Sequence, residues 1–117
     1  MKDQAQLLID VLLDKSARED ERDDAAIDLR RFKELRVLDA LIKIASDPNE
    51  GDVIVDNCAE SIGEICIGMN RFDYNAFRKL VPFAQKIVFG FIVSHNPELI
   101  NQSLKNDLAK EFNVNSK

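Results

Sequence analysis

The segment Asp23–Leu29 reads DDAAIDL, and the segment Asp56–Ile62, 33 positions further along the chain, reads DNCAESI. Each copy begins with acidic or polar residues, continues with two small residues, and places an aliphatic residue three positions after the second small one. A period of this length is typical of helical-repeat solenoids, in which each helix pair buries its apolar face against the next pair. Because solenoids present extended surfaces to partners, the repeat favours a binding protein.

The composition of the 117-residue chain, with 45% hydrophobic and 32% charged residues, is that of one soluble globular domain. We expect this domain to cover residues 1–112 and the tail, residues 113–117, to fray. No apolar run approaches the roughly 18–20 residues that span a bilayer, and the N-terminus lacks the pattern of a cleavable secretory signal. These features predict a cytoplasmic protein without membrane association.

Charge and cysteine content narrow the classes of partner and compartment. The net charge of −5 argues against direct nucleic-acid binding, which normally uses a basic face, and suits a basic protein partner. Cys58 and Cys66 lie eight residues apart in one predicted helix. Their Cα atoms are then roughly 12 Å apart, too far for a disulfide. We therefore expect two buried, reduced thiols in a cytosolic protein.

Helical periodicity runs through almost the whole chain and predicts an all-α fold of about six to seven helices. The expected helices cover residues 2–14, 18–31, 34–46, 52–67, 74–80, 82–94 and 99–112. The clearest turn, Asp47–Gly51, separates the third helix from the fourth. Ser16 and Asp20 are candidate N-caps of the second helix, with Glu19 completing a capping box behind Ser16. Asp73 is the expected N-cap of the fifth helix.

The aromatic residues gather in the second half of the chain, where six of eight fall between Phe72 and Phe91. Their large side chains fill space that small residues leave open in the first repeat. The expected core members are Phe83, Phe89 and one of Phe77 or Phe91. Gly63 costs its predicted helix about 1 kcal/mol relative to alanine, which indicates a close approach by another helix.

Three elements of this pattern together resemble the HEAT-type repeat, especially its short bacterial form related to phycobilisome-lyase repeats. They are DAAIDL at residues 24–29, LDALI at residues 38–42 and the turn at Asp47-Pro48. In that family a charged residue precedes two small residues, the partner helix ends in a Leu-Ile pair, and an Asp-containing turn leads to the next unit. The resemblance implies a short α-solenoid, a right-handed stack of two to three helical hairpins.

The resemblance covers Arg18–Ile67 well and Val81–Phe112 loosely. The second copy lacks the basic residue that often precedes the small pair, and the insertion Phe72–Leu80 interrupts the repeat. Both departures leave open a degenerate, compact solenoid in place of a regular array.

Residues that could carry catalysis are sparse. His95 is the only histidine and lies beside a predicted turn, where we expect it to cap or decorate a helix end. Cys58 and Cys66 occupy apolar or small-residue positions of the repeat, so we expect core packing and not nucleophilic chemistry. The sequence has no Cys/His cluster at metal-ligand spacing and no Gly-rich phosphate loop. We therefore expect no enzyme, no cofactor and no metal.

Carboxylates form the more informative set. Asp56, Glu60 and Glu64 lie at i, i+4 and i+8 of the fourth predicted helix, and no lysine or arginine lies between Asn49 and Asn70. Asp23 takes the position equivalent to Asp56 and extends this acidic row onto the neighbouring repeat. The row is either a solvated helix face or a docking surface for a basic protein. Carboxylates on a helix face without a binding loop make only weak cation sites.

Two aromatic residues join the candidate contacts. Phe72 and Tyr74 lie at a loop and a helix start, next to Arg71 and Asp73. Interface hot spots favour amphipathic anchors of this kind, so both residues are candidates for partner contact.

The leading hypothesis for function is a protein-binding module that acts by occlusion. Its most concrete form is an immunity protein, an antitoxin that neutralises a cognate basic toxin such as a nuclease by binding over its active site; this is an analogy from architecture and charge. One alternative is a scaffold or adaptor subunit of a larger complex. Another is a factor like the lyases that share the repeat, which the short chain disfavours. The partner's identity, the stoichiometry and the oligomeric state stay open.

Overall fold

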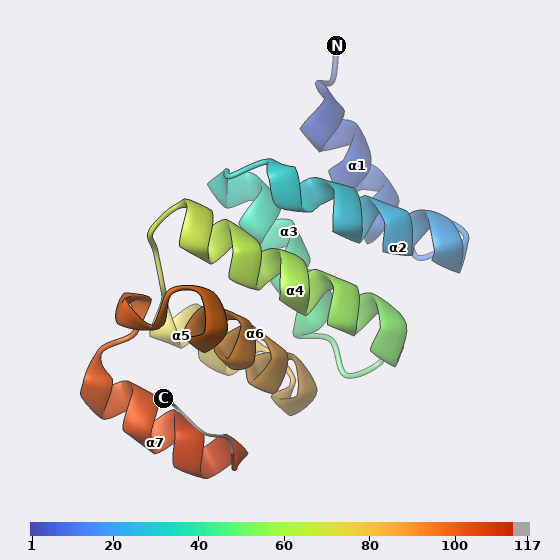
Figure 1. Ribbon diagram of the computed structural model, residues 1–117. Coiled ribbons are helices and arrows are strands. Elements are labelled where there is room, and N and C mark those ends of the chain that lie inside the picture. The colour runs from blue at the N-terminus through green and yellow to red at the C-terminus, as the bar shows by residue number, and fades with distance from the viewer. Residues whose placement is uncertain (114–117) are drawn as a thin grey trace.

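The structure, a computed structural model, describes residues 1–113, and over these residues it contains helices and no strands (Figure 1). Its α-helices are α1 (Gln4–Leu13), α2 (Glu19–Asp28), α3 (Leu35–Ala45), α4 (Asp52–Gly68), α5 (Tyr74–Lys79), α6 (Pro82–His95) and α7 (Gln102–Phe112). Two short 3-10 helices, η1 (Leu29–Arg31) and η2 (Pro97–Leu99), precede α3 and α7. The predicted all-α fold is confirmed.

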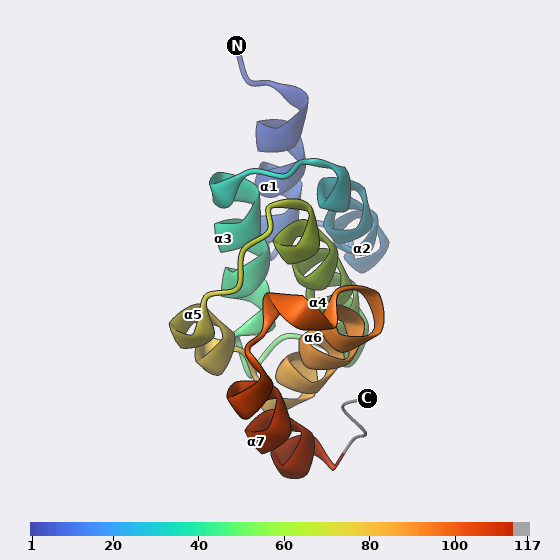
Figure 2. The same cartoon turned by 60° about the vertical axis from the view of Figure 1, so that its left-hand side comes forward.

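The helices stack as hairpins in two layers (Figures 1 and 2). α1, α3 and α5 lie in one layer, and α2, α4 and α6 lie in the other. α4 is central, because it packs against α3 in its own hairpin and against α2 and α6 on either side. α7 covers the end of the stack beyond α6. The result is an elongated, solenoid-like stack with extents of 44 × 27 × 20 Å.

The second helices of the three hairpins begin at one edge of the stack. The first turns of α2 and α4 border a common groove, and the first turns of α4 and α6 border another. We call this side of the molecule the N-terminal edge. It brings together side chains that are about 30 residues apart in the sequence, as expected when a repeat of this length stacks on itself.

The start of α2 differs from the prediction. α2 begins after Arg18, whose backbone is extended and whose side chain makes no capping hydrogen bond. Ser16 instead donates from both its N–H and its hydroxyl to the carboxylate of Asp14, and Asp20 accepts two hydrogen bonds from Arg18. The prediction of a cap at Ser16 or Asp20 was therefore wrong, because both side chains are engaged locally. Asp73 does cap α5, as predicted.

Two predicted helices are each divided in the structure into an α-helix and a short 3-10 helix. The second predicted helix continues past Asp28 as the 3-10 turn η1, and the last predicted helix divides into η2 and α7. The side chain of Asn101 accepts from the N–H of Leu104 and thereby starts α7 anew. Asn113, the first residue of the tail that was expected to fray, is the C-cap of α7. Its backbone is in the left-handed conformation, with φ of 55°. The rest of that tail, 114–117, lies outside the described residues.

The aromatic core is mostly as expected, with one exception. Phe89 is fully buried and Phe77 is 4% exposed, so Phe77 is the second of the predicted core aromatics. Phe83, in contrast, is 46% exposed, and its prediction as a core residue was wrong. The inward positions of α6 are taken by its neighbours Ala84 and Val88, which leaves Phe83 at the N-terminal edge.

Gly63 marks the close approach that the sequence indicated. A Cβ atom at Gly63 would lie 2.9 Å from Cδ1 of Phe91, which is closer than packed side chains tolerate. The bare backbone of α4 therefore lets α6 pack directly on it. Cys58 and Cys66 flank this region of α4 as buried, free thiols, in agreement with the prediction.

Candidate protein interface

The acidic row lies on the layer formed by α2 and α4. Asp23 belongs to α2, whereas Asp56 and Glu60 are one turn apart on α4, and all three side chains are half-buried. Burial raises the pKa of Glu60, and the hydrogen bond and charge of Asp56 raise it further. Burial also raises the pKa of Asp23, with the charges of Glu19 and Asp24 adding to the effect. These carboxylates are therefore held close to like charge, which is unfavourable at neutral pH.

Glu64, at the far end of the row, is in a different environment. Nε of Arg30 lies 3.7 Å from Oε2 of Glu64 and donates to Oγ of Ser61 at 3.3 Å. The Ser61 hydroxyl in turn donates to the carbonyl of Ala26 at 2.7 Å, which ties α4 to α2. The pair of Arg30 with Glu64 was not predicted, because no lysine or arginine lies near Glu64 in the sequence. The 33-residue period could have indicated it, since Arg30 is equivalent in the repeat to Gly63, the residue before Glu64.

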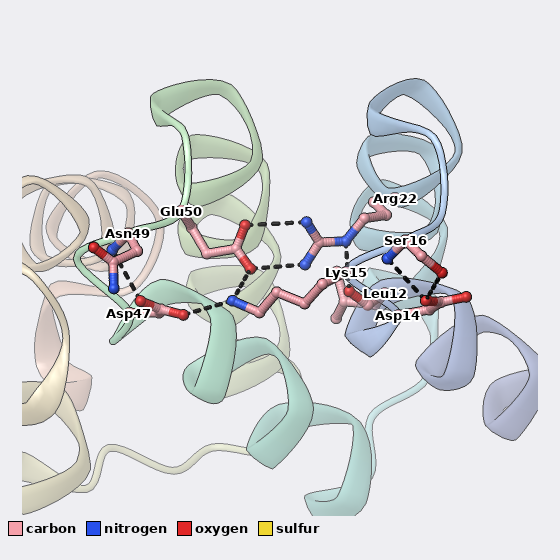
Figure 3. Close-up of polar contacts among 8 residues, drawn as sticks. All are labelled: Leu12, Asp14, Lys15, Ser16, Arg22, Asp47, Asn49 and Glu50. Carbon is pink, nitrogen blue, oxygen red and sulfur yellow. Dashed lines mark hydrogen bonds and ion pairs between the residues drawn. The ribbon is translucent and has the colours of Figure 1, made fainter.

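A second polar group, the Arg22 clasp, closes the edge between α2 and α4 (Figure 3). Arg22 makes a bidentate pair with Glu50, at 3.0 and 2.7 Å, and its Nε donates to the carbonyl of Leu12 at 2.9 Å. Nζ of Lys15 lies 2.9 Å from Glu50 and 2.6 Å from Asp47. The clasp therefore joins α2, the end of α1 and the turn before α4.

The clasp is largely withdrawn from solvent. The side chains of Arg22 and Glu50 are only 8% and 6% exposed. The hydrogen bond from Arg22 lowers the pKa of Glu50, against the opposing effect of burial. This pair was not predicted, because its two members are 28 residues apart in the sequence and belong to different hairpins.

The clasp and the acidic row meet in a shallow groove between the first turns of α2 and α4. This groove has a volume of about 150 Å³. Glu19, Asp23 and Asp52 line it, and the exposed side chain of Val53 lies at its border. Since Arg22 is already engaged by Glu50, the charge left available to a partner here is negative.

The two candidate aromatics lie in the other layer. Tyr74, at the start of α5, is 39% exposed, and its hydroxyl accepts from Nε of Arg78 at 2.8 Å. Arg78 also pairs with Glu111 of α7 at 2.6 Å. Phe72 is half-buried, with its ring 5.3 Å from that of Phe77. α5 and the pair α2 and α4 lie on different sides of the stack, so the predicted site residues fall on two surfaces (Figure 2).

Cys58 and Cys66 have environments unlike those of reactive thiols. Burial raises the pKa of Cys58 to about 12 and that of Cys66 to about 11, which keeps both thiols protonated at neutral pH. His95, at the end of α6, stacks on the ring of Phe91 at 4.1 Å, and its Nδ1 lies 2.9 Å from the carbonyl oxygen of the same residue.

The described part of the chain contains neither a metal-binding cluster nor a helix that could span a membrane. Within residues 1–113, no cluster of three or more histidine, cysteine or acidic side chains is arranged to hold a metal ion. None of the helices in this range combines the length and the apolar character needed to cross a membrane.

Comparisons with known proteins add no family to this picture. Neither a protein-family model, nor a curated protein, nor a solved structure matches the chain.

Proposed function

We propose that the chain is a protein-binding module, and in its most concrete form an immunity protein that covers the active site of a basic toxin such as a nuclease. The observation that carries the proposal is the crowding of partly buried carboxylates, with Glu60 beside Asp56 on α4 and Asp23 beside Glu19 and Asp24 on α2. Burial and like charge raise the pKa of Asp23 and of Glu60. The charge-neutralising partner for such a surface is then a basic protein.

The cations nearest to this surface offset its charge only in part, because each also has another carboxylate partner. Arg22 is bound by Glu50, and Arg30 lies between Ser61 and Glu64. Carboxylates that gain a lysine or arginine from a partner lose their mutual repulsion, and long-range attraction speeds the encounter. A basic active-site cleft, such as one that binds a nucleic-acid backbone, has the complementary charge. Occlusion of that cleft requires no chemistry from this chain.

One observation favours the scaffold or adaptor alternative. Leu7 on the terminal helix α1 is 51% exposed, and an apolar side chain on a terminal repeat is where a further subunit would pack. A single leucine provides a smaller contact than the acidic surface, so the scaffold remains the second candidate. The factor resembling repeat-containing lyases has no such observation in its favour.

The decisive experiment identifies the partner and then tests the charges. The chain is crosslinked to its partner in native extract, and association of the purified pair is followed by stopped-flow fluorescence at low and high salt. In the triple variant Asp23→Lys, Asp56→Lys, Glu60→Lys we expect the association rate at low salt to fall by about tenfold or more. Stoichiometric wild-type protein should also abolish the partner's enzymatic activity.

The matched control reverses three carboxylates elsewhere. Asp39, Glu98 and Asp107 are exposed residues of α3, η2 and α7. Changing all three to lysine alters the net charge by the same amount and should leave more of the association rate intact. Equal losses in both triple variants would contradict a specific acidic surface. A partner whose activity is unaffected by binding would contradict the immunity function and favour the scaffold alternative.

A further inference from the structure

Two junctions between successive hairpins lie along the N-terminal edge, one between the first turns of α2 and α4 and one between the first turns of α4 and α6. They have equivalent positions in the repeat but different side chains. Glu19 and Arg22 are the first and fourth residues of α2, and Asp52 and Val55 are the first and fourth residues of α4. At the first junction, Arg22 reaches across to Glu50 and closes the space between the hairpins. At the second junction, the equivalent residue is valine, which cannot make such a bridge.

The second junction is left open as an apolar groove. It has a volume of about 270 Å³, and its apolar lining is Pro48 together with Val81, Pro82 and Phe83 at the start of α6. Val55 of α4, which is 3% exposed, also borders it. This space is smaller than a typical site for a drug-sized ligand and suits one large side chain. Phe83, at the border of the groove, is 46% exposed.

Charge surrounds this groove on the side of α4. Asp47, Glu50 and Asp52 line its rim, and no lysine or arginine contributes to the lining. Asp47 and Glu50 already bind Lys15, so Asp52 is the carboxylate left for a partner, with Asp56 one turn further along α4. An apolar centre with a charged rim is the usual anatomy of a protein interface.

We propose that the second groove is a docking site for an apolar side chain that is flanked by lysine or arginine on a basic protein partner. The inference rests on the proposed function for the sign of the partner's charge, and it adds the anchor: the apolar side chain packs on Val55 and Phe83 while its basic neighbours pair with Asp52 and Asp56. Phe83 is then a hot-spot residue of the interface, in keeping with the share of binding energy that buried aromatic contacts carry.

Short peptides test this site without knowledge of the partner. The probes are acetyl-Lys-Leu-Lys-amide, its serine analogue acetyl-Lys-Ser-Lys-amide, and the acidic analogue acetyl-Glu-Leu-Glu-amide. Each is titrated into the ¹⁵N-labelled protein, and amide shifts are followed by NMR. We expect the leucine peptide to bind about tenfold more tightly than the serine peptide, since it buries one large aliphatic side chain. Its shifts should centre on Val55 and Phe83, and the acidic peptide should not bind.

Two variants separate the anchor from general effects. Phe83→Ala should remove the tenfold advantage of leucine over serine, and thermal unfolding should show that the variant stays folded. Leu7→Ala, which truncates a similarly exposed residue of α1, should keep the advantage.

Each other outcome has a defined meaning. Equal binding of the leucine and serine peptides would overturn the anchor and leave the proposed function standing. Absence of binding by both basic peptides would count against the acidic surface as well. Equal binding of the acidic peptide would overturn the charge requirement. Self-association of the wild-type protein in sedimentation velocity, lost in Phe83→Ala, would overturn the proposal by showing that a second copy occupies the groove.

Discussion

Arg22 links the first two hairpins through one buried side chain that contacts both Glu50 and the carbonyl of Leu12. Replacement by methionine would leave the buried Glu50 with Lys15 as its remaining basic partner and remove the donor to the Leu12 carbonyl. Removing one member of a buried ion pair typically costs about 3–5 kcal/mol, because the other charge stays buried. Since Lys15 relieves part of this cost, we expect Arg22→Met to lower the free energy of unfolding by about 3 kcal/mol, measured by urea denaturation.

Two further variants test whether burial is the cause. Arg18 pairs with Asp20 at the surface, with side chains that are 73% and 68% exposed, so Arg18→Met should leave the free energy of unfolding nearly unchanged. The double variant Arg22→Met with Glu50→Leu replaces the buried pair by apolar groups and should recover much of the loss. Equal destabilisation by Arg22→Met and Arg18→Met would contradict the role assigned to the clasp.

At the scale of the element, two glycines provide a matched pair of substitutions. Gly63→Ala in α4 gains about 1 kcal/mol of helix propensity, but its Cβ would lie 3.1 Å or less from three atoms of Phe91. Overpacking of this kind costs about 1–3 kcal/mol, so we expect a net loss of about 1 kcal/mol. Gly90→Ala in α6 meets no atom within 4 Å and should stabilise by up to about 1 kcal/mol. Thermal unfolding of both variants measures the difference.

The opposite signs of the two effects make the test specific. If Gly63→Ala were stabilising like Gly90→Ala, α4 and α6 would be further apart than the structure places them. If both were destabilising, the space around Gly90 would be less open than described. Either result would contradict the close packing of α6 against α4.

The helices themselves were predictable because periodicity is a local property. In the third hairpin, periodicity did not predict which aromatic side chains of α6 are buried. Phe83 has the same chemistry as Phe89, yet one is half-exposed and the other is fully buried. Which face of α6 turns inward depends on α4 and α7, and no local pattern encodes that choice. The predicted start of α2 was wrong for a related reason, since the Ser16 hydroxyl donates to Asp14 and Asp20 lies inside the first turn, where it pairs with Arg18.

The candidate site was predictable in part. Spacing alone placed Asp56 and Glu60 on one face of a helix, and the period placed Asp23 in the neighbouring repeat. Ion pairs between hairpins, such as Arg22 with Glu50, were missed because charges of either sign are common at such separations in this chain. The second groove could not be predicted from the sequence either, because its walls come from α4, the turn before it and the start of α6, and its shape depends on how these elements pack.

At the scale of the whole molecule, carboxylates act on stability in two opposite directions. The pKa of Glu50 is lowered, so its stabilising contribution is present above the unfolded value of about 4.3 and is lost as pH falls through the folded value. The pKa values of Asp23 and Glu60 are raised, so the folded protein binds these protons more tightly. The cost of burying these charges and their repulsion by neighbouring carboxylates are fully present above the folded pKa values and are relieved as pH falls toward about 4.

These signs predict a stability maximum below neutral pH and above the unfolded carboxyl pKa values of about 4. Urea denaturation from pH 7 to pH 3 should show the free energy of unfolding rise slightly before it falls. The double variant Asp23→Asn with Glu60→Gln should be more stable at pH 7 by a few tenths of a kcal/mol, since solvent screens these partly exposed groups, and should lose the initial rise. The control Asp39→Asn with Glu98→Gln removes the same charge elsewhere and should keep the rise. Identical pH profiles for the wild type and the Asp23→Asn with Glu60→Gln variant would show that these two carboxylates are not destabilised in the folded protein, and the proposal of a basic partner would lose its support.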